Sequence, residues 1–236
     1  DEDFAEQCEE DRRQLAAIRQ AREGKAAEWF EEHADEWDDL RRRHSPDDQV
    51  EQALRGALDS EPLGELLDIG TGTGRMAELF GTSATRIVAL DKSLEMLRVA
   101  RAKLQNLPAE QIELVQGDFL SLPFDAATFD TVLFHQVLHY AADPVVPLRE
   151  AARVLRPGGR IAIVDFAAHG HEELRDRYQH ARLGFEDAQL ADVLKETGFV
   201  PDAPVSLEGE TLVVKIWVAR RADALGAREK TRKAAR

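Results

Sequence analysis

A glycine-rich turn follows an apolar run in the stretch Glu65-Leu66-Leu67-Asp68-Ile69-Gly70-Thr71-Gly72-Thr73-Gly74-Arg75. The apolar residues predict a buried strand. The glycines let the backbone turn tightly and approach a ligand at a point where a Cβ atom would collide with it. A helix that begins at Arg75 would direct its first N–H groups toward the same place. The stretch therefore predicts a strand, a ligand-binding turn and a helix in succession.

A second apolar run ends in a carboxylate, Arg86-Ile-Val-Ala-Leu-Asp91. An acidic residue about 20 positions after such glycines is the expected partner of a ribose diol. The glycines are spaced Gly70-x-Gly72-x-Gly74, whereas dinucleotide sites favour G-x-G-x-x-G. The pattern indicates a nucleoside cofactor other than a dinucleotide.

Four segments in this order resemble the motifs of class I S-adenosylmethionine (SAM) dependent methyltransferases. They are the glycine turn from Asp68 to Gly74, the acid Asp91, Gln116-Gly117-Asp118-Phe119, and Leu155-Arg-Pro-Gly-Gly-Arg160 with the apolar run to Asp165. The resemblance covers roughly residues 60 to 220, and within the class it is greatest to the ubiquinone/menaquinone C-methyltransferase-like branch. The segments Phe134–Tyr140 and His180–Phe185 resemble more narrowly the methyltransferase half of bacterial fusions with a regulator of the arsenical-resistance-repressor type.

Strand and helix patterns alternate after Leu63. We expect strands near 65–69, 86–91, 112–116, 129–134 and 159–165, and helices near 74–80, 93–105, 144–155 and 186–197. Apolar strands that alternate with helices predict a parallel sheet covered on both faces. Val205–Leu207 and Thr211–Val218 flank a Glu-Gly-Glu turn, so the last strand should run antiparallel. The predicted fold is α/β and Rossmann-like, with a mostly parallel seven-stranded sheet preceded by an N-terminal helical segment.

We divide the chain into an N-terminal helical linker or lid (1–60), a methyltransferase domain (61–220) and a basic, flexible tail (221–236). Charged and aromatic residues at helical spacing predict one long helix, or two, over residues 3–43, with Gly24 as a weak point. Ser45 and Pro46 should begin another helix. Two interpretations of the first segment stay open, namely a linker or dimer contact and a lid whose Phe30 and Trp37 line the substrate pocket.

Composition restricts the partners. A net charge of −14 disfavours a nucleic-acid or membrane surface on this portion. Cys8 is the single cysteine, which fits a reducing cytoplasm and excludes an internal disulfide. The chain begins at Asp1 without methionine, so we expect either trimming or a missing N-terminal module, through which DNA could be bound.

The resemblance implies a set of residues for SAM and its product S-adenosylhomocysteine. Asp91 would accept from both ribose hydroxyls, Asp118 from the adenine amino group beside the Phe119 N–H, and Asp68 would fix the turn or reach the SAM amino group. The full cofactor set is Asp68, Gly70, Thr71, Gly72, Gly74, Asp91, Lys92, Asp118, Phe119 and His135.

His135 and His139 follow the fourth strand, where open parallel sheets bind their ligands. Either could act as a base toward the methyl acceptor or merely shape the pocket. Tyr140, Asp165 and Arg182 are further candidates for the substrate pocket. Asp165, His169 and His171 could in principle hold a metal, but no ligand framework completes the set, and we predict none.

Two functions stay open from the sequence. The first is a methyltransferase that modifies oxygen, sulfur, nitrogen or carbon of a small molecule. The second is a SAM or S-adenosylhomocysteine sensor that regulates an upstream winged-helix DNA-binding module. The possible quaternary state includes a homodimer.

Overall fold

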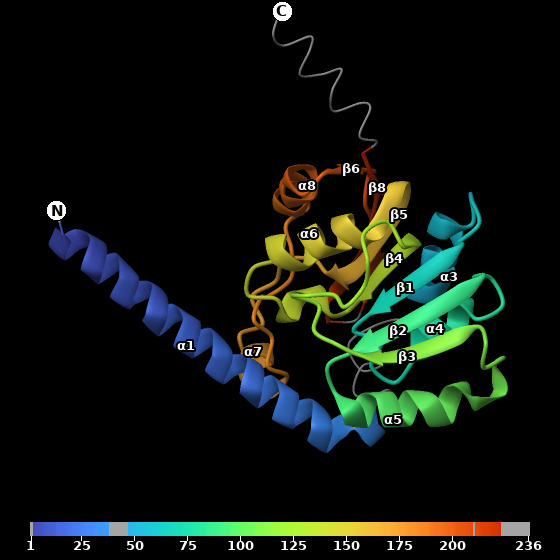
Figure 1. Ribbon diagram of the computed structural model, residues 1–236, viewed down its shortest axis with the longest axis horizontal. Helices are drawn as coiled ribbons and strands as arrows, with labels where there is room; N and C mark the ends of the chain where they lie inside the picture. The colour runs from blue at the N-terminus through green and yellow to red at the C-terminus, as the bar shows by residue number, and fades with distance from the viewer. Residues whose placement is uncertain (1, 38–46, 210, 223–236) are drawn as a thin grey trace, which may run out of the picture.

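The computed structural model describes residues 2–37, 47–209 and 211–222. It is an α/β protein with one sheet between two layers of helices (Figure 1). The predicted start of a helix at Ser45 and Pro46, and nearly all of the predicted tail, lie outside these described residues. In the described part, no helix has both the length and the apolar character needed to cross a membrane.

The sheet has the order β3-β2-β1-β4-β5-β8-β6, and β7 also pairs with β8. The first five strands run parallel, and β8 runs antiparallel to β5. The strand bounds are β1 Glu65–Ile69, β2 Arg86–Asp91, β3 Ile112–Gln116, β4 Phe129–His135, β5 Leu155–Phe166, β6 Phe199–Pro201, β7 Val205–Glu208 and β8 Val213–Arg221.

The mostly parallel sheet and the antiparallel last strand are confirmed. The strand count differs from the prediction because β6 and β7 pair with successive parts of β8. The two short strands together fill one position of the sheet, so eight strands occupy seven positions. Pro201 and Pro204 lie at and after the end of β6, and proline cannot donate to a strand ladder.

The helices divide between the two faces of the sheet (Figure 1). Buried residues of α3, α4 and α5 pack on one face, and those of α6 and α8 pack on the other. The α-helix bounds are α1 Glu2–His33, α3 Asp47–Leu58, α4 Arg75–Phe80, α5 Leu94–Lys103, α6 Val145–Val154, α7 Glu173–Arg177 and α8 Asp187–Glu196.

Local signals explain where several helices begin. The hydroxyl of Ser93 accepts from the Met96 N–H at 3.2 Å, which confirms it as the cap of α5. Gly74 precedes α4 with a φ of 82°, a left-handed conformation that favours glycine. The helix α1 is continuous through Gly24, so the expected weak point does not divide it.

The N-terminal helix α1 extends away from the body of the domain, and only its C-terminal end approaches α5 (Figure 1). A short 3₁₀ helix, η1 (Ala34–Glu36), follows it. Asp35 of η1 pairs with Arg98 of α5 at 3.1 Å. The end of α1 and η1 therefore lie against α5.

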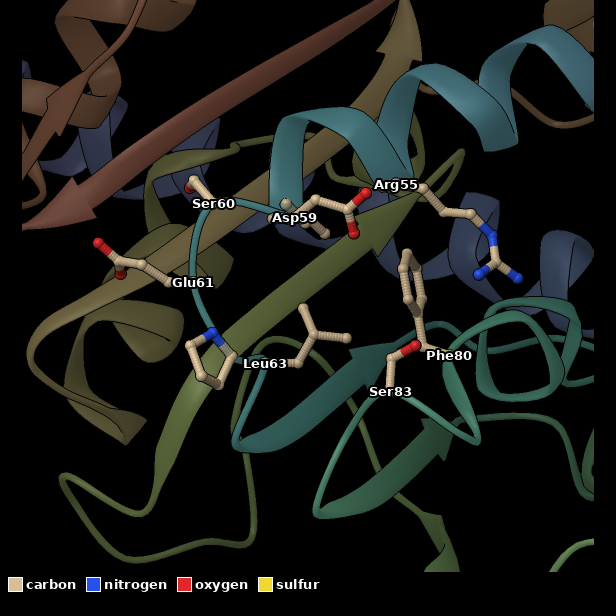
Figure 2. Close-up of a pocket in the computed structure, with 9 residues that line it drawn as sticks. Arg55, Asp59, Ser60, Glu61, Leu63, Phe80 and Ser83 are labelled. Atoms are coloured by element: carbon tan, nitrogen blue, oxygen red, sulfur yellow. The ribbon is translucent and has the colours of Figure 1, made fainter.

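A hollow of about 350 Å³ lies at the opposite, amino-terminal edge of the sheet (Figure 2). Its wall includes the chain before β1 and the turn after α4. The Arg55 guanidinium lies 5.8 Å from the centre of the Phe80 ring and donates to the Leu79 carbonyl at 2.7 Å. None of the residues predicted to bind a cofactor or a substrate lines this hollow.

A nearly buried ion pair joins α3 to the first residue of α4. Both carboxylate oxygens of Glu51 accept from Arg75, each at 2.7 Å, and Glu51 is only 7% exposed. The exposed Glu78 accepts from the same guanidinium at 2.9 Å. Glu51 is buried and contacts the guanidinium at two points, whereas Glu78 is exposed and contacts it at one.

We expect Glu51→Gln to lower the free energy of unfolding by about 1–2 kcal/mol, because it breaks a two-point, charge-assisted contact. Glu78→Gln is the matched control, and exposed pairs contribute only about 0–1 kcal/mol. Urea unfolding of both variants measures the difference. Equal effects of the two substitutions would contradict the assigned role of Glu51.

Candidate active site

The candidate residues of the sequence analysis gather at the carboxyl ends of the parallel strands. Asp68 lies in β1, Asp91 ends β2, His135 ends β4 and Asp165 lies near the end of β5. The glycine turn, Asp118 and the 3₁₀ helix η3 (Leu138–Tyr140) follow β1, β3 and β4. Open parallel sheets form their ligand sites at this edge.

Backbone hydrogen bonds to β2 shape the glycine turn. The N–H groups of Gly70 and Thr71 both donate to the Leu90 carbonyl, at 2.8 and 2.9 Å. Gly70 and Gly72 have φ values of 68° and 54°. A Cβ atom on Gly70 would lie 2.3 Å from Val137, whereas one on Gly72 would meet nothing closer than the Trp37 indole at 3.5 Å. Gly70 is therefore required by internal packing, and Gly72 faces outward from the turn.

Asp91 connects the turn to β2. Its carboxylate accepts from the N–H groups of Gly72 at 2.8 Å and Ser93 at 2.9 Å. Burial raises the pKa of Asp91, and these N–H donors oppose that rise. A half-buried carboxylate fixed in this way still has lone pairs available for a hydroxyl pair.

Asp68 is completely buried beneath the turn. One oxygen accepts from the Thr71 hydroxyl at 2.6 Å, and the other has no hydrogen-bond partner. Burial raises the pKa of Asp68 to about 7, with the neighbouring Asp91 charge as a smaller cause. A buried carboxylate oxygen without a donor is a natural position for a ligand's ammonium or hydroxyl group.

Asp118 closes the end of the site beside β3. It accepts from the Lys92 ammonium at 2.9 Å and from the Leu120 N–H at 2.9 Å. Phe119 packs against the apolar core beside it. An acceptor for a base amino group and an apolar surface thus lie next to each other in the sequence and in the fold.

His139 and Asp165 form a buried pair. The His139 Nδ1 atom lies 2.8 Å from Oδ1 of Asp165, and the backbone N–H of His139 donates to Oδ2 at 3.2 Å. The two residues are 1% and 0% exposed. The Nε2 atom of His139 is buried and has no hydrogen-bond partner. His135, the other candidate base, is half-buried at the end of β4.

Aromatic rings surround His139. The centres of the Tyr140 and His180 rings lie 4.2 and 4.1 Å from the centre of its ring, and that of Phe166 lies at 5.5 Å. Burial, and secondarily the charge of Asp165, raises the pKa of Tyr140. The phenol therefore stays protonated at neutral pH and is not a competing base.

The end of α1 covers these rings and the glycine turn. Phe30 contacts Tyr140 edge-to-face at 5.1 Å between ring centres, and Trp29 contacts Tyr178 at 5.8 Å. Trp37 stacks edge-to-face on both Trp29 and Phe30 and reaches Gly72. The N-terminal segment therefore contacts both the turn and the surroundings of the His139–Asp165 pair.

Two other candidates occupy less central positions. The backbone N–H of Arg182 donates to the His139 carbonyl at 2.9 Å, but its guanidinium lies over Phe185 and bonds the Ala142 carbonyl at 3.3 Å. His171 pairs with Glu173, and burial lowers the pKa of His169. Within the described residues, no group of three or more possible ligands is arranged to hold a metal ion.

Some members of the site were not assigned a role from the sequence. Tyr178 lay in no motif, and Trp29 and His180 lay in segments that the sequence singled out without a role in the site for either residue. The pairing of His139 with Asp165 joins residues 26 positions apart and follows from the adjacency of β4 and β5. Gln136 has a φ of 52° and a buried amide nitrogen without a partner, which no local pattern indicates.

Comparison with known proteins identifies the domain. Residues 67–163 match the family described as a methyltransferase domain. A demethylmenaquinone methyltransferase of Streptomyces griseus is 35% identical over 116 residues, which are 49% of this chain and 48% of that protein.

Residues 67–163 form a methyltransferase domain, and the similarities are to SAM-dependent methyltransferases of class I.

A second relative, an uncharacterized 37.1 kDa protein in transposon TN4556 of Streptomyces fradiae, is 40% identical over 111 residues, 45% of this chain and 31% of that protein. The chain thus spans less than half the length of both relatives. The putative methyltransferase in a complex with the Haloferax volcanii Trm112 activator superposes with a TM-score of 0.68 at 21% identity, over 82% of this chain and 97% of that one. At that identity the likeness concerns the fold. The demethylmenaquinone enzymes support the predicted resemblance to the ubiquinone/menaquinone C-methyltransferase-like branch.

The residues of this methyltransferase domain fit SAM on two observations. The unpartnered Asp68 oxygen is an acceptor for an amino acid ammonium group, whose positive charge would favour the ionised carboxylate. Gly72 leaves open the space that a Cβ atom would fill between the turn and Trp37. Both features lie on the same turn, beside the Asp91 carboxylate.

We expect Asp68→Asn to stabilise the ligand-free protein above neutral pH. In the wild type, the folded chain keeps the Asp68 proton up to about pH 7, whereas the unfolded chain releases it near pH 3.8. Stability is therefore lost as the pH rises between these values, by on the order of 4 kcal/mol. The amide oxygen of the substituted side chain can still accept from Thr71, but the amide cannot ionise. Urea unfolding at pH 5 and pH 8 tests this, and parallel pH profiles for the two proteins would refute it.

Proposed function

We propose that the chain binds SAM at the glycine turn and transfers its methyl group to a small-molecule acceptor. The observation that carries the proposal is the juxtaposition of the Gly72–Asp91 hydrogen bond with the unpartnered Asp68 oxygen at the carboxyl edge of the sheet. It is supported by the family match over residues 67–163 and by the similarity to demethylmenaquinone methyltransferases.

Different residues would bind different parts of SAM. Asp91 would accept from the ribose hydroxyls, and Asp118 with Lys92 and Phe119 would hold the adenine. Asp68 would receive the ammonium group, while the backbone of the turn passes close to the chain of the ligand. Residues Gly70, Thr71, Gly72, Gly74 and His135 complete the proposed cofactor set.

SAM supplies an electrophilic methyl group whose leaving group is a neutral thioether, so the protein's tasks are orientation, exclusion of water and removal of a proton from the acceptor. His139 is our first candidate base and His135 the second. The preference for His139 rests on its contact with Asp165 and on its unpartnered Nε2 atom. Phe30, Trp37 and Tyr140 would line the acceptor pocket, with Asp165 and Arg182 behind them.

We assign residues 1–60 as a lid that includes the end of α1, residues 61–220 as the catalytic domain and residues 221–236 as a tail. The contacts of Trp37 with Gly72 and of Phe30 with Tyr140 support the lid. The single cysteine supports a cytoplasmic setting.

The alternative is a SAM or S-adenosylhomocysteine sensor joined to a winged-helix DNA-binding module, as a monomer or a homodimer. The observation that favours it is the projection of α1 away from the domain (Figure 1). The deciding measurement is incubation of the protein with radiolabelled SAM and a small-molecule cell extract. A labelled product supports the enzyme, and binding without product supports the sensor.

We expect Asp91→Ala to weaken SAM binding by at least tenfold, because charge-assisted hydrogen bonds contribute about 1.5–3 kcal/mol each. Glu113→Ala removes an exposed acid of β3 and serves as the control. Calorimetry on both folded variants gives the affinities. An unchanged affinity in Asp91→Ala would remove Asp91 from the ribose site.

We expect His139→Gln to slow label transfer by about 10²–10⁴-fold with SAM affinity retained, because the base acts on the acceptor. His171→Gln changes an exposed histidine and should leave the rate unaltered. The rate of label transfer is also measured for His135→Gln, which identifies His135 as the base if His139→Gln has no effect. Wild-type rates in both His139→Gln and His135→Gln would leave catalysis to orientation alone.

A further inference from the structure

The buried carboxylate of Asp165 makes all of its recorded hydrogen bonds to η3 and to its own strand. Oδ1 accepts from the Phe166 N–H at 2.8 Å and lies 2.8 Å from His139 Nδ1. Oδ2 accepts from the backbone N–H of His139 at 3.2 Å. The carboxylate of Asp165 therefore contacts His139 at two points, the ring nitrogen Nδ1 and the backbone N–H.

The geometry determines which nitrogen of His139 carries the proton. An ionised carboxylate can only accept hydrogen bonds, so the Nδ1 atom that faces Asp165 must be the protonated one. The Nε2 atom then has a free lone pair. It is buried without a hydrogen-bond partner, and an unsatisfied buried acceptor in a native protein calls for an explanation.

We propose that Asp165 is a positioning residue that holds His139 in the Nδ1–H tautomer and directs the Nε2 lone pair at the methyl acceptor. This inference rests on the proposed function. Asp165 does not touch the acceptor. It also supplies the negative charge that stabilises the imidazolium formed when His139 takes a proton.

The proton and charge balance follow from this arrangement. The bond between the acceptor atom and its hydrogen breaks, and the electron pair stays on the acceptor atom, which forms the new bond to the methyl carbon. The proton goes to Nε2 of His139. The positive charge lost when the sulfonium becomes a thioether reappears on the imidazolium, beside the Asp165 carboxylate. No other reactant is required.

The side chains that surround His139 and Asp165 do not compete for the hydrogen bond between them. The neighbouring Tyr140 is kept protonated by burial, and the rings of Phe166 and His180 pack beside His139. Arg182 donates its backbone N–H to the His139 carbonyl, but its guanidinium lies over Phe185 rather than on Asp165. Among the side chains that the structure describes, the His139 imidazole is therefore the hydrogen-bond partner of this carboxylate, and its other partners are backbone N–H groups.

The first test needs no acceptor. Protein labelled with ¹⁵N-histidine is examined by two-bond ¹H–¹⁵N correlation NMR at mildly alkaline pH, and His139→Gln identifies the His139 signals. We expect Nδ1 to carry the proton and Nε2 to have the shift of an unprotonated nitrogen. A wild-type spectrum with the proton on Nε2 overturns the proposal, whatever the enzyme does.

The second test uses Asp165→Asn, which removes the charge and keeps an oxygen acceptor of similar size. We expect label transfer from SAM to the cell extract to slow by about 10²–10⁴-fold, with SAM affinity and thermal stability close to wild type. Asp143→Asn, an exposed aspartate just after η3, is the control and should have the wild-type rate.

The outcomes separate the two proposals. A wild-type rate in folded Asp165→Asn overturns the positioning role and leaves the methyltransferase intact. Loss of rate together with SAM affinity or stability assigns Asp165 a structural role instead. If wild-type protein forms no labelled product, methyl transfer itself fails, and the NMR spectrum still decides the tautomer.

Discussion

The hydrogen bond from the Gly72 N–H to the Asp91 carboxylate is the contact on which the cofactor edge of this domain depends. Gly70, Thr71 and Gly72 donate in succession to the last two residues of β2, so the chain leaving β1 turns across the end of its neighbouring strand. That turn sets the direction of α4 and places Asp91 at the rim. Without these hydrogen bonds, the flexible glycine backbone would lack the contacts that fix its conformation.

A second constraint is the burial of two carboxylates at the carboxyl edge of the sheet. The middle of the sheet is apolar on both faces, yet Asp68 and Asp165 are completely buried near the carboxyl ends of β1 and β5. A buried carboxylate is costly unless it is hydrogen-bonded. Asp68 accepts from Thr71 in the turn after its own strand, and Asp165 accepts from His139 in η3, which follows the neighbouring strand β4. Asp68 retains an oxygen without a donor. This edge is therefore incomplete without a ligand.

Sequence patterns predicted what depends on local spacing. The five parallel strands, the antiparallel hairpin and the Ser93 cap were each readable from neighbouring residues. The three-residue strand β6 was not, because so short a segment has no period of its own. The His139–Asp165 pair was missed for another reason. Both residues were candidates, but only the side-by-side placement of β4 and β5 brings them together, and a single sequence does not contain that adjacency.

The family match covers the proposed cofactor residues but not the aromatic rings of residues 29–37 and 178–180. The glycine turn, Asp91, Asp118 and His139 lie within residues 67–163, which match the family. The rings that cover His139 come from outside that range, namely from Trp29 to Trp37 and from Tyr178 to His180. Similarity to quinone-modifying relatives thus supports the cofactor more strongly than the acceptor. In the proposed site, the acceptor would meet the end of α1 and the segment around His180, which lie outside the family match.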